Sequence, residues 1–220
     1  MTSRATRGYV FGGADLNNKL YANVDVYAPA GNKWSVGPSL PVGRAGLAAV
    51  AAPDGRLYAI GGTDGGASAS GRVEALTPAT RRWATAAQLP NARNSLAASV
   101  GGDGRIYAIG GTTNGTILSG MGVKVVEAYG PIFKLAAASG KAGASIAITS
   151  GSNFAANATV GIYFDDVTSK PVITVASDAT GKLPAGASFV VPAVAAGAHT
   201  VILRDSRSRY PVRGAFSVSP

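Results

Sequence analysis

The stretch Gly55-Arg56-Leu57-Tyr58-Ala59-Ile60-Gly61-Gly62 decides the fold of the first part of this chain. It returns almost unchanged at residues 104–111, and a shorter form, Tyr9-Val10-Phe11-Gly12-Gly13, lies near the start. The three glycine pairs, at 12–13, 61–62 and 110–111, are 49 residues apart. A period near fifty in which an apolar strand runs into a glycine pair is typical of a β-propeller, which is built from repeated four-stranded sheets called blades.

Other residues recur with the glycine pairs. In the best-preserved repeat we expect four short strands, at 47–51, 57–60, 73–76 and around Trp83, each bounded by turn-forming residues. Trp34 occupies the place of Trp83 one period earlier. An indole at a recurrent place of a repeat is predicted to pack between neighbouring sheets.

This pattern resembles the kelch repeat over about residues 8–130. The residues of the first repeat that carry the resemblance are Gly12-Gly13, Tyr27, Trp34, Leu40-Pro41 and Arg44. Leu76 replaces the tyrosine in the second repeat, and no tryptophan follows Tyr129 in the third. The resemblance implies a propeller whose loops engage other molecules.

The repeats amount to about three blades. The first lacks its opening strand and the third lacks its tryptophan strand, whereas closed propellers have about four to eight blades. An open arc would leave sheet faces and edges exposed. We therefore hold two hypotheses: the chain is the C-terminal part of a larger propeller, or two chains self-associate to complete a ring.

At Pro131 the period stops, and short alternating strands separated by turn residues follow to residue 220. We predict a seven-stranded β-sandwich there, which gives an all-β chain with two domains, 1–130 and 131–220. The second domain resembles bacterial Ig-like domains of the IPT/TIG kind, on the segments 143–154, 192–201 and 216–218. That resemblance implies a spacer in a surface or secreted protein.

Composition excludes several function classes. The net charge of +9 is spread along the 220 residues without a basic run, which argues against nucleic acid as a partner. No 18-residue apolar run occurs, so no membrane span is expected. Residues 1–8 lack the apolar core of a signal peptide.

A propeller followed by such a sandwich also resembles the galactose oxidase family. That family holds copper with two histidines and two tyrosines, one of them cross-linked to a cysteine. This chain has one histidine, His199, and no cysteine. We therefore predict no catalytic residues, no metal and no cofactor, and expect His199 to cap a turn. Asp165-Asp166 are neighbours whose side chains would point to opposite faces of a strand, so they do not form a catalytic carboxylate pair.

Arg44 and Arg93 are the best candidates for ligand binding. Each precedes the first strand of the next repeat, on the side where Asp64 and Asn114 follow the glycine pairs. Guanidinium groups suit carboxylate ligands. In the alternative interpretation, the two arginines bond backbone carbonyls inside the propeller, because they belong to the repeat itself.

The resulting expectation is a non-enzymatic, extracellular or cell-surface protein whose propeller binds a protein or a glycan, with the sandwich as spacer. Two alternatives stay open. One is the remnant of a copper-radical carbohydrate oxidase, and the other is a purely structural protein of the cell envelope.

Overall fold

The computed structural model describes residues 7–66, 68–114, 122–207 and 211–220. Its regular elements are strands, apart from one short 3-10 turn, η1 (Pro29–Gly31). The chain divides into two compact units, Met1–Ser99 with Tyr107–Ala128, and Val100–Ile106 with Tyr129–Pro220. Within the described ranges, the chain contains no helix long and apolar enough to cross a membrane.

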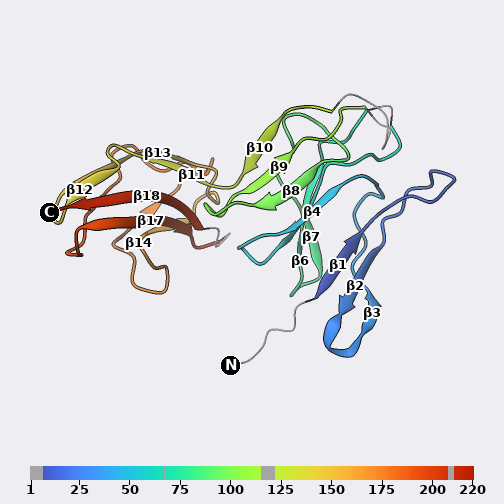
Figure 1. Cartoon of the computed structure of the whole chain (residues 1–220), viewed down its shortest axis with the longest axis horizontal. Coiled ribbons are helices and arrows are strands. Elements are labelled where there is room, and N and C mark those ends of the chain that lie inside the picture. Colours follow the sequence, from blue (N-terminus) through green and yellow to red (C-terminus); the bar gives the residue numbers. More distant parts are fainter. Residues whose placement is uncertain (1–6, 67, 115–121, 208–210) are drawn as a thin grey trace. The chain divides into compact units, whose positions relative to one another are not determined.

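Three sheets follow one another at the predicted period, and the first two are antiparallel throughout (Figure 1). The first blade comprises β1 (Gly8–Phe11), β2 (Val24–Ala28) and β3 (Lys33–Val36). The second comprises β4 (Ala48–Ala51), β5 (Leu57–Ile60), β6 (Val73–Thr77) and β7 (Arg82–Thr85), in that order. The third comprises β8 (Ala97–Val100), β9 (Ile106–Ile109) and β10 (Val126–Tyr129). The predicted all-β class, with a partial propeller of about three blades, is confirmed.

A small apolar core joins the first two blades. Its buried members are Val24, Val26, Leu40 and Ala59. Trp83 of β7 packs on this core as predicted, with its ring edge-on to Phe11 at 5.7 Å between centroids. Burial of aromatic and branched side chains from both sheets holds the two blades together.

The matching prediction for Trp34 is wrong. Its side chain is 61% exposed and touches Tyr27 of its own sheet, with 5.0 Å between the ring centroids. The physical reason is that Trp83 packs on the blade that precedes it along the chain. The described residues contain no blade before the first, so nothing covers Trp34.

Residues 129–220 form two sheets. One has the order β11 (Ile132–Leu135), β13 (Ser145–Ser152), β16 (Ser188–Val190). The other has the order β12 (Ser139–Lys141), β18 (Pro211–Ser219), β17 (Gly197–Asp205), β14 (Thr159–Phe164), β15 (Ile173–Ala176). Apolar side chains of both sheets form one buried core, including Ile148, Val160, Phe189 and Phe216. This is the expected β-sandwich, with β12 as an additional strand. The sequence Ser139-Gly140-Lys141 has no apolar alternation, so nothing in it indicated a strand.

Candidate binding rim

The glycine pairs hold the connections that carry the two arginines. The backbone N–H of Gly13 donates to the carbonyl of Arg44 at 2.9 Å, and that of Gly62 donates to the carbonyl of Arg93 at the same distance. Gly62 has a φ of +100°, and a Cβ there would lie 2.7 Å from the carbonyl oxygen of Ala45. Glycine is thus needed both for the left-handed backbone and for the close approach.

Arg93 spans two blades. Its carbonyl accepts from the second blade, while its guanidinium donates to two carbonyls of the third, Gly110 at 3.0 Å and Val125 at 3.1 Å. Its Nη2 also pairs with the carboxylate of Glu127 at 2.6 Å, and its side chain is fully buried. These partners compensate the burial of the charge, because an unpaired buried charge is strongly destabilising.

Arg44 has the same place between the first two blades but fewer bonds. Its Nη2 pairs with the buried carboxylate of Glu74 and donates to the carbonyl of Ala59 at 3.4 Å. The Nε and Nη1 of Arg44 have no hydrogen-bond partner among the described residues. Burial lowers the pKa of Arg44, and the opposing charge of Glu74 only partly offsets that effect.

The loops after the glycine pairs form a continuous edge, which we call the rim: residues 13–21, 63–66, 68–72 and 112–114. A Cβ built at Gly65 would lie 3.6 Å from the Leu20 side chain, so the first two loops lie close together. Ser68 forms a β-bridge with Asn114, and the N–H of Ala69 donates to the carbonyl of Thr113 at 3.1 Å, so the last two loops are in direct contact. The rim therefore extends over all three blades.

Asp64 and Asn114 both lie on this rim, on its second and third loops. Asp64 faces Arg72 at 3.6 Å, and both side chains are substantially exposed. Asn114 is held by its carbonyl, which accepts from the amide of the buried Asn94. The structure thus puts Asp64 at the surface, Asn114 half-buried on the rim with its Oδ1 buried, and the two arginines beneath them.

In the alternative interpretation, Arg44 and Arg93 bond backbone carbonyls inside the propeller, and this geometry agrees with it. Contact of the two arginines with a ligand stays a prediction. Sequence reasoning missed their partners. Glu74 and Glu127 occupy the same place in successive repeats, Val-Glu-Ala in both cases, and that recurrence was the available signal. It also missed Arg72, which has no counterpart at the same place in the other repeats.

His199 lies in β17. Its ring bonds the carbonyl of Ala195, in the segment before β17, and also the turn that follows β14. Its Nδ1 is 2.7 Å from the carboxylate of Asp165, and its Nε2 is 2.8 Å from the carbonyl of Ala195. The bond with Asp165, followed by that with Ala195, raises the pKa of His199. Asp165 has a left-handed backbone, with φ +61°, and lies in the turn after β14 rather than on a strand. Both ring nitrogens are thus engaged within the sandwich.

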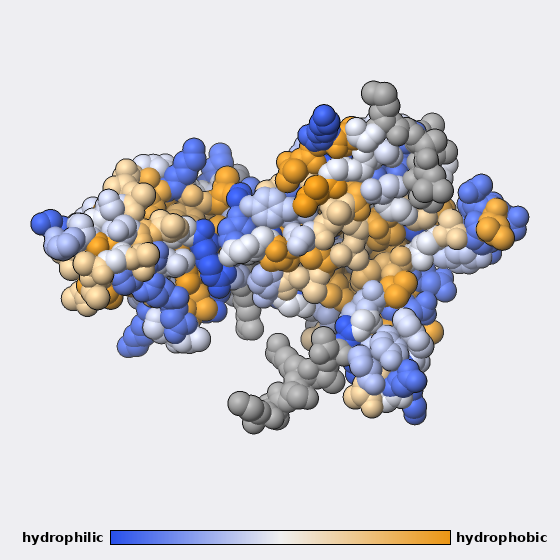
Figure 2. Space-filling model, viewed as in Figure 1, coloured by the Kyte–Doolittle hydropathy of each residue, from blue (hydrophilic) through white to orange (hydrophobic). Residues whose placement is uncertain are grey.

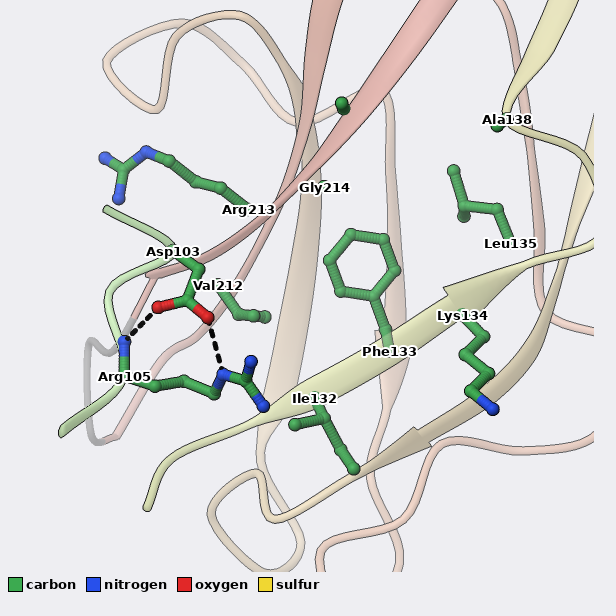
Figure 3. A pocket seen from close by; sticks show the side chains of 11 residues that line it. Asp103, Arg105, Ile132, Phe133, Lys134, Leu135, Ala138, Val212, Arg213 and Gly214 are labelled. Carbon is green, nitrogen blue, oxygen red and sulfur yellow. Dashed lines mark hydrogen bonds and ion pairs between the residues drawn. The ribbon is translucent and has the colours of Figure 1, made fainter. Parts of the chain in front are cut away.

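A pocket of about 340 Å³ lies within the second unit, against β11 (Figure 3). The Phe133 ring lies between β11 and the strand that carries Gly214. Three cationic side chains, Arg105, Lys134 and Arg213, contribute to its wall. Asp103 bonds the Nε of Arg105 at 2.7 Å. None of the predicted site residues lines this pocket.

Comparison with known proteins gives one family match. The kelch motif matches residues 44–90, which are the second blade with the connections on both sides of it. A search of curated proteins found no match. Among solved structures, a fungal alcohol oxidase of the AA5 family, in complex with copper, is similar at 17% identity with a TM-score of 0.44. The match covers 98% of this chain, which spans 52% of the length of that one.

Proposed function

We propose that the first unit is a non-enzymatic binding module that engages a protein partner through the rim. The observation that carries this is the continuity of the three loops across blades whose interior is fixed by buried ion pairs. Exposed loops on a rigid scaffold are the usual place for recognition in proteins. The kelch motif at residues 44–90 supports the proposal, because kelch domains commonly bind proteins.

The composition of the rim favours a protein over a small ligand. Leu16 is fully exposed at the tip of the first loop, beside charged and amide side chains. In Figure 2 the loop between β1 and β2 shows an apolar patch within a hydrophilic surround. Arg72 and Asp64 add one charge of each sign. An apolar anchor with a polar border is the pattern of protein interfaces.

The absence of enzymatic activity is part of the proposal and rests on donor chemistry. The sequence has no cysteine and one histidine, and both nitrogens of that histidine are bonded to Asp165 and Ala195. Copper analysis of purified protein tests this part. Copper at one equivalent per chain, with oxidation of a sugar alcohol, would revive the oxidase alternative.

We further propose that the sandwich is an Ig-like spacer and that the protein works outside the cell or on its surface. The support is the resemblance of the sandwich sequence to IPT/TIG domains, together with its two-sheet core. Fractionation of the source cells tests the location. Recovery of the protein only from the cytoplasm would contradict it.

A protein array and a glycan array, probed with the wild-type chain, test the binding proposal. Partners found there are retested with Leu16→Ser and Arg72→Ala, and with Lys170→Ala in the sandwich as a matched control for an exposed side chain. We expect protein partners whose binding falls at least tenfold in both rim variants and not in the control. Binding that is unchanged in the two rim variants would contradict the proposal, and so would an array result in which glycans are the sole partners.

A further inference from the structure

One face of the first blade has no partner among the described residues. The strand register places six side-chain positions on it, in two rows across the sheet: Val10, Asp25 and Val36, then Gly8, Tyr27 and Trp34. Val10 is 51% exposed, Trp34 61% and Val36 74%. We call this surface the open face. Single exposed apolar residues are normal on protein surfaces, but three large ones on one face indicate an interaction site.

The second blade shows what such a face contacts. Ala59, Glu74 and Trp83 are the counterparts of Val10, Asp25 and Trp34 one period later. Ala59 is fully buried, and Trp83 packs on Phe11 of the preceding blade. The indole N–H of Trp83 donates to the carbonyl of Pro38 at 2.9 Å.

The carboxylate on this face is matched by an arginine in the other blades. Glu74 pairs with Arg44, and Glu127 of the third blade pairs with Arg93. Each arginine comes from the connection that leads from the preceding blade. Asp25 is exposed and forms no ion pair with any residue that the structure describes. The open face therefore lacks both its apolar cover and its cation.

We propose that the open face docks a further propeller blade of the same kind, whose outgoing connection supplies an arginine to Asp25. That blade also presents an aromatic or branched side chain against Trp34, in the role of Phe11, and a carbonyl to the indole N–H, in the role of Pro38. This inference goes beyond binding at the rim, because it concerns a different surface and a different partner.

Charge favours such a blade over a second copy of this chain. The third blade of a copy offers exposed apolar side chains, Ile109 and Val126, that could cover Trp34. The sequence after β10 runs through Gly130-Pro131 into β11, and no arginine follows until Arg204. A copy docked in this way would cover Asp25 without a cation at the repeat's place, and burial of an unpaired carboxylate is costly.

The test adds one repeat of the protein's own sequence. Residues 46–105 are joined directly to Gly8, which continues the period without a gap and supplies a whole blade. The arginine at 93 of the added copy then lies 30 residues before Asp25, the separation between Arg44 and Glu74. Trp83→Phe in both copies leaves Trp34 as the single tryptophan. We expect a blue shift of its emission and a several-fold fall in acrylamide quenching, relative to the same chain without the added repeat.

The charge is tested by Asp25→Asn. We expect this change to weaken Trp34 protection in the extended chain and to leave the urea midpoint of the chain without the added repeat unchanged. Three results would overturn the proposal. The first is an extended chain that does not fold, or in which acrylamide quenches Trp34 as strongly as before. The second is an extended chain in which Asp25→Asn leaves Trp34 protection unchanged, and the third is a dimer of the original chain in which Trp34 is already protected. The last result would assign the open face to a second copy. Loss of rim binding would bear on none of these measurements.

Discussion

The indole N–H of Trp83 donates to the carbonyl oxygen of Pro38 at 2.9 Å, across the boundary between the first two blades. This bond orients the ring that forms a T-shaped pair with Phe11. Trp34, its counterpart one period earlier, forms a tilted ring pair with Tyr27 of its own sheet, and no other ring contact among the residues that the structure describes. The same residue of the repeat therefore has two different environments within one chain.

The two tryptophans should differ in their contribution to stability. Trp83→Ala removes contacts between two blades, and we expect it to lower the free energy of unfolding by about 3 kcal/mol. Trp34→Ala removes a single exposed ring pair and should cost about 1 kcal/mol or less. Urea unfolding followed by far-UV circular dichroism measures both. Equal losses would mean that Trp34 is covered in solution.

The arginines allow a sharper comparison. Arg93→Lys keeps a cation for Glu127 but abandons the carbonyls of Gly110 and Val125 and a bond from Nε to the carbonyl of Asn91. We expect a loss of about 2–3 kcal/mol, at about 1 kcal/mol for each bond.

Arg44→Lys is the matched control for that change. Arg44 uses only Nη2, and its Nε and Nη1 have no partner among the described residues. Lysine retains the ion pair with Glu74, so we expect a loss of about 1 kcal/mol or less. Equal urea midpoints for the two lysine variants would contradict this account of the connections.

The glycine pairs lead to a third prediction. Gly61 has a φ of +66°, and a Cβ there would lie 2.3 Å from the carbonyl oxygen of Arg93. Gly61→Ala therefore carries both the left-handed penalty and a displaced connection, and we expect a loss of about 3 kcal/mol or more. Gly55 has a φ of +80° with open space around it, so Gly55→Ala should cost about 1–2 kcal/mol. The difference between the two urea midpoints measures the cost of the clash, because both variants carry the left-handed backbone penalty. Similar midpoints would argue against the clash.

The blades could be predicted well from the sequence because the same residue types recur at the same places of each repeat. Glycine pairs, turns and apolar strands recur at one spacing, so each blade corroborates the others. The environment of a side chain that depends on an adjacent sheet was harder to predict. The exposure of Trp34 is decided by what stands beside its sheet, and the pairing of Arg93 with Glu127 joins residues that the sequence separates widely. β12 pairs with β18 although its own residues carry no strand pattern.

The candidate site was predictable in position but not in role. The order of strands put Asp64 and Asn114 on one side of the blades, and the structure places both on the rim. Nothing in residue type reveals that a guanidinium is buried, because burial depends on the carboxylate that the third strand supplies. Two recurrences in the sequence point to it: that of Arg44 and Arg93 within the repeat, and that of Glu74 and Glu127.

The last prediction concerns pH and the second unit. The bond with Asp165 raises the pKa of His199 above its usual 6.5, so the imidazolium stabilises the folded sandwich below pH 6.5. That contribution is lost as the pH rises through the folded pKa. Burial raises the pKa of Asp165, but bonds from His199 and from the N–H of Thr200 outweigh it and hold the pKa below 3.8. The Asp165 contribution is therefore lost only as the pH falls through that lowered value.

Since the sequence has one histidine, NMR titration of its ring protons reports His199 without ambiguity. We expect a midpoint above 6.5. Hydrogen exchange of β17 should speed up between pH 6.5 and the folded pKa, after correction for intrinsic exchange, and this pH dependence should vanish in His199→Gln, which keeps a neutral donor. A midpoint at or below 6.5, or the same pH dependence in His199→Gln, would show that the ion pair with Asp165 does not stabilise the sandwich.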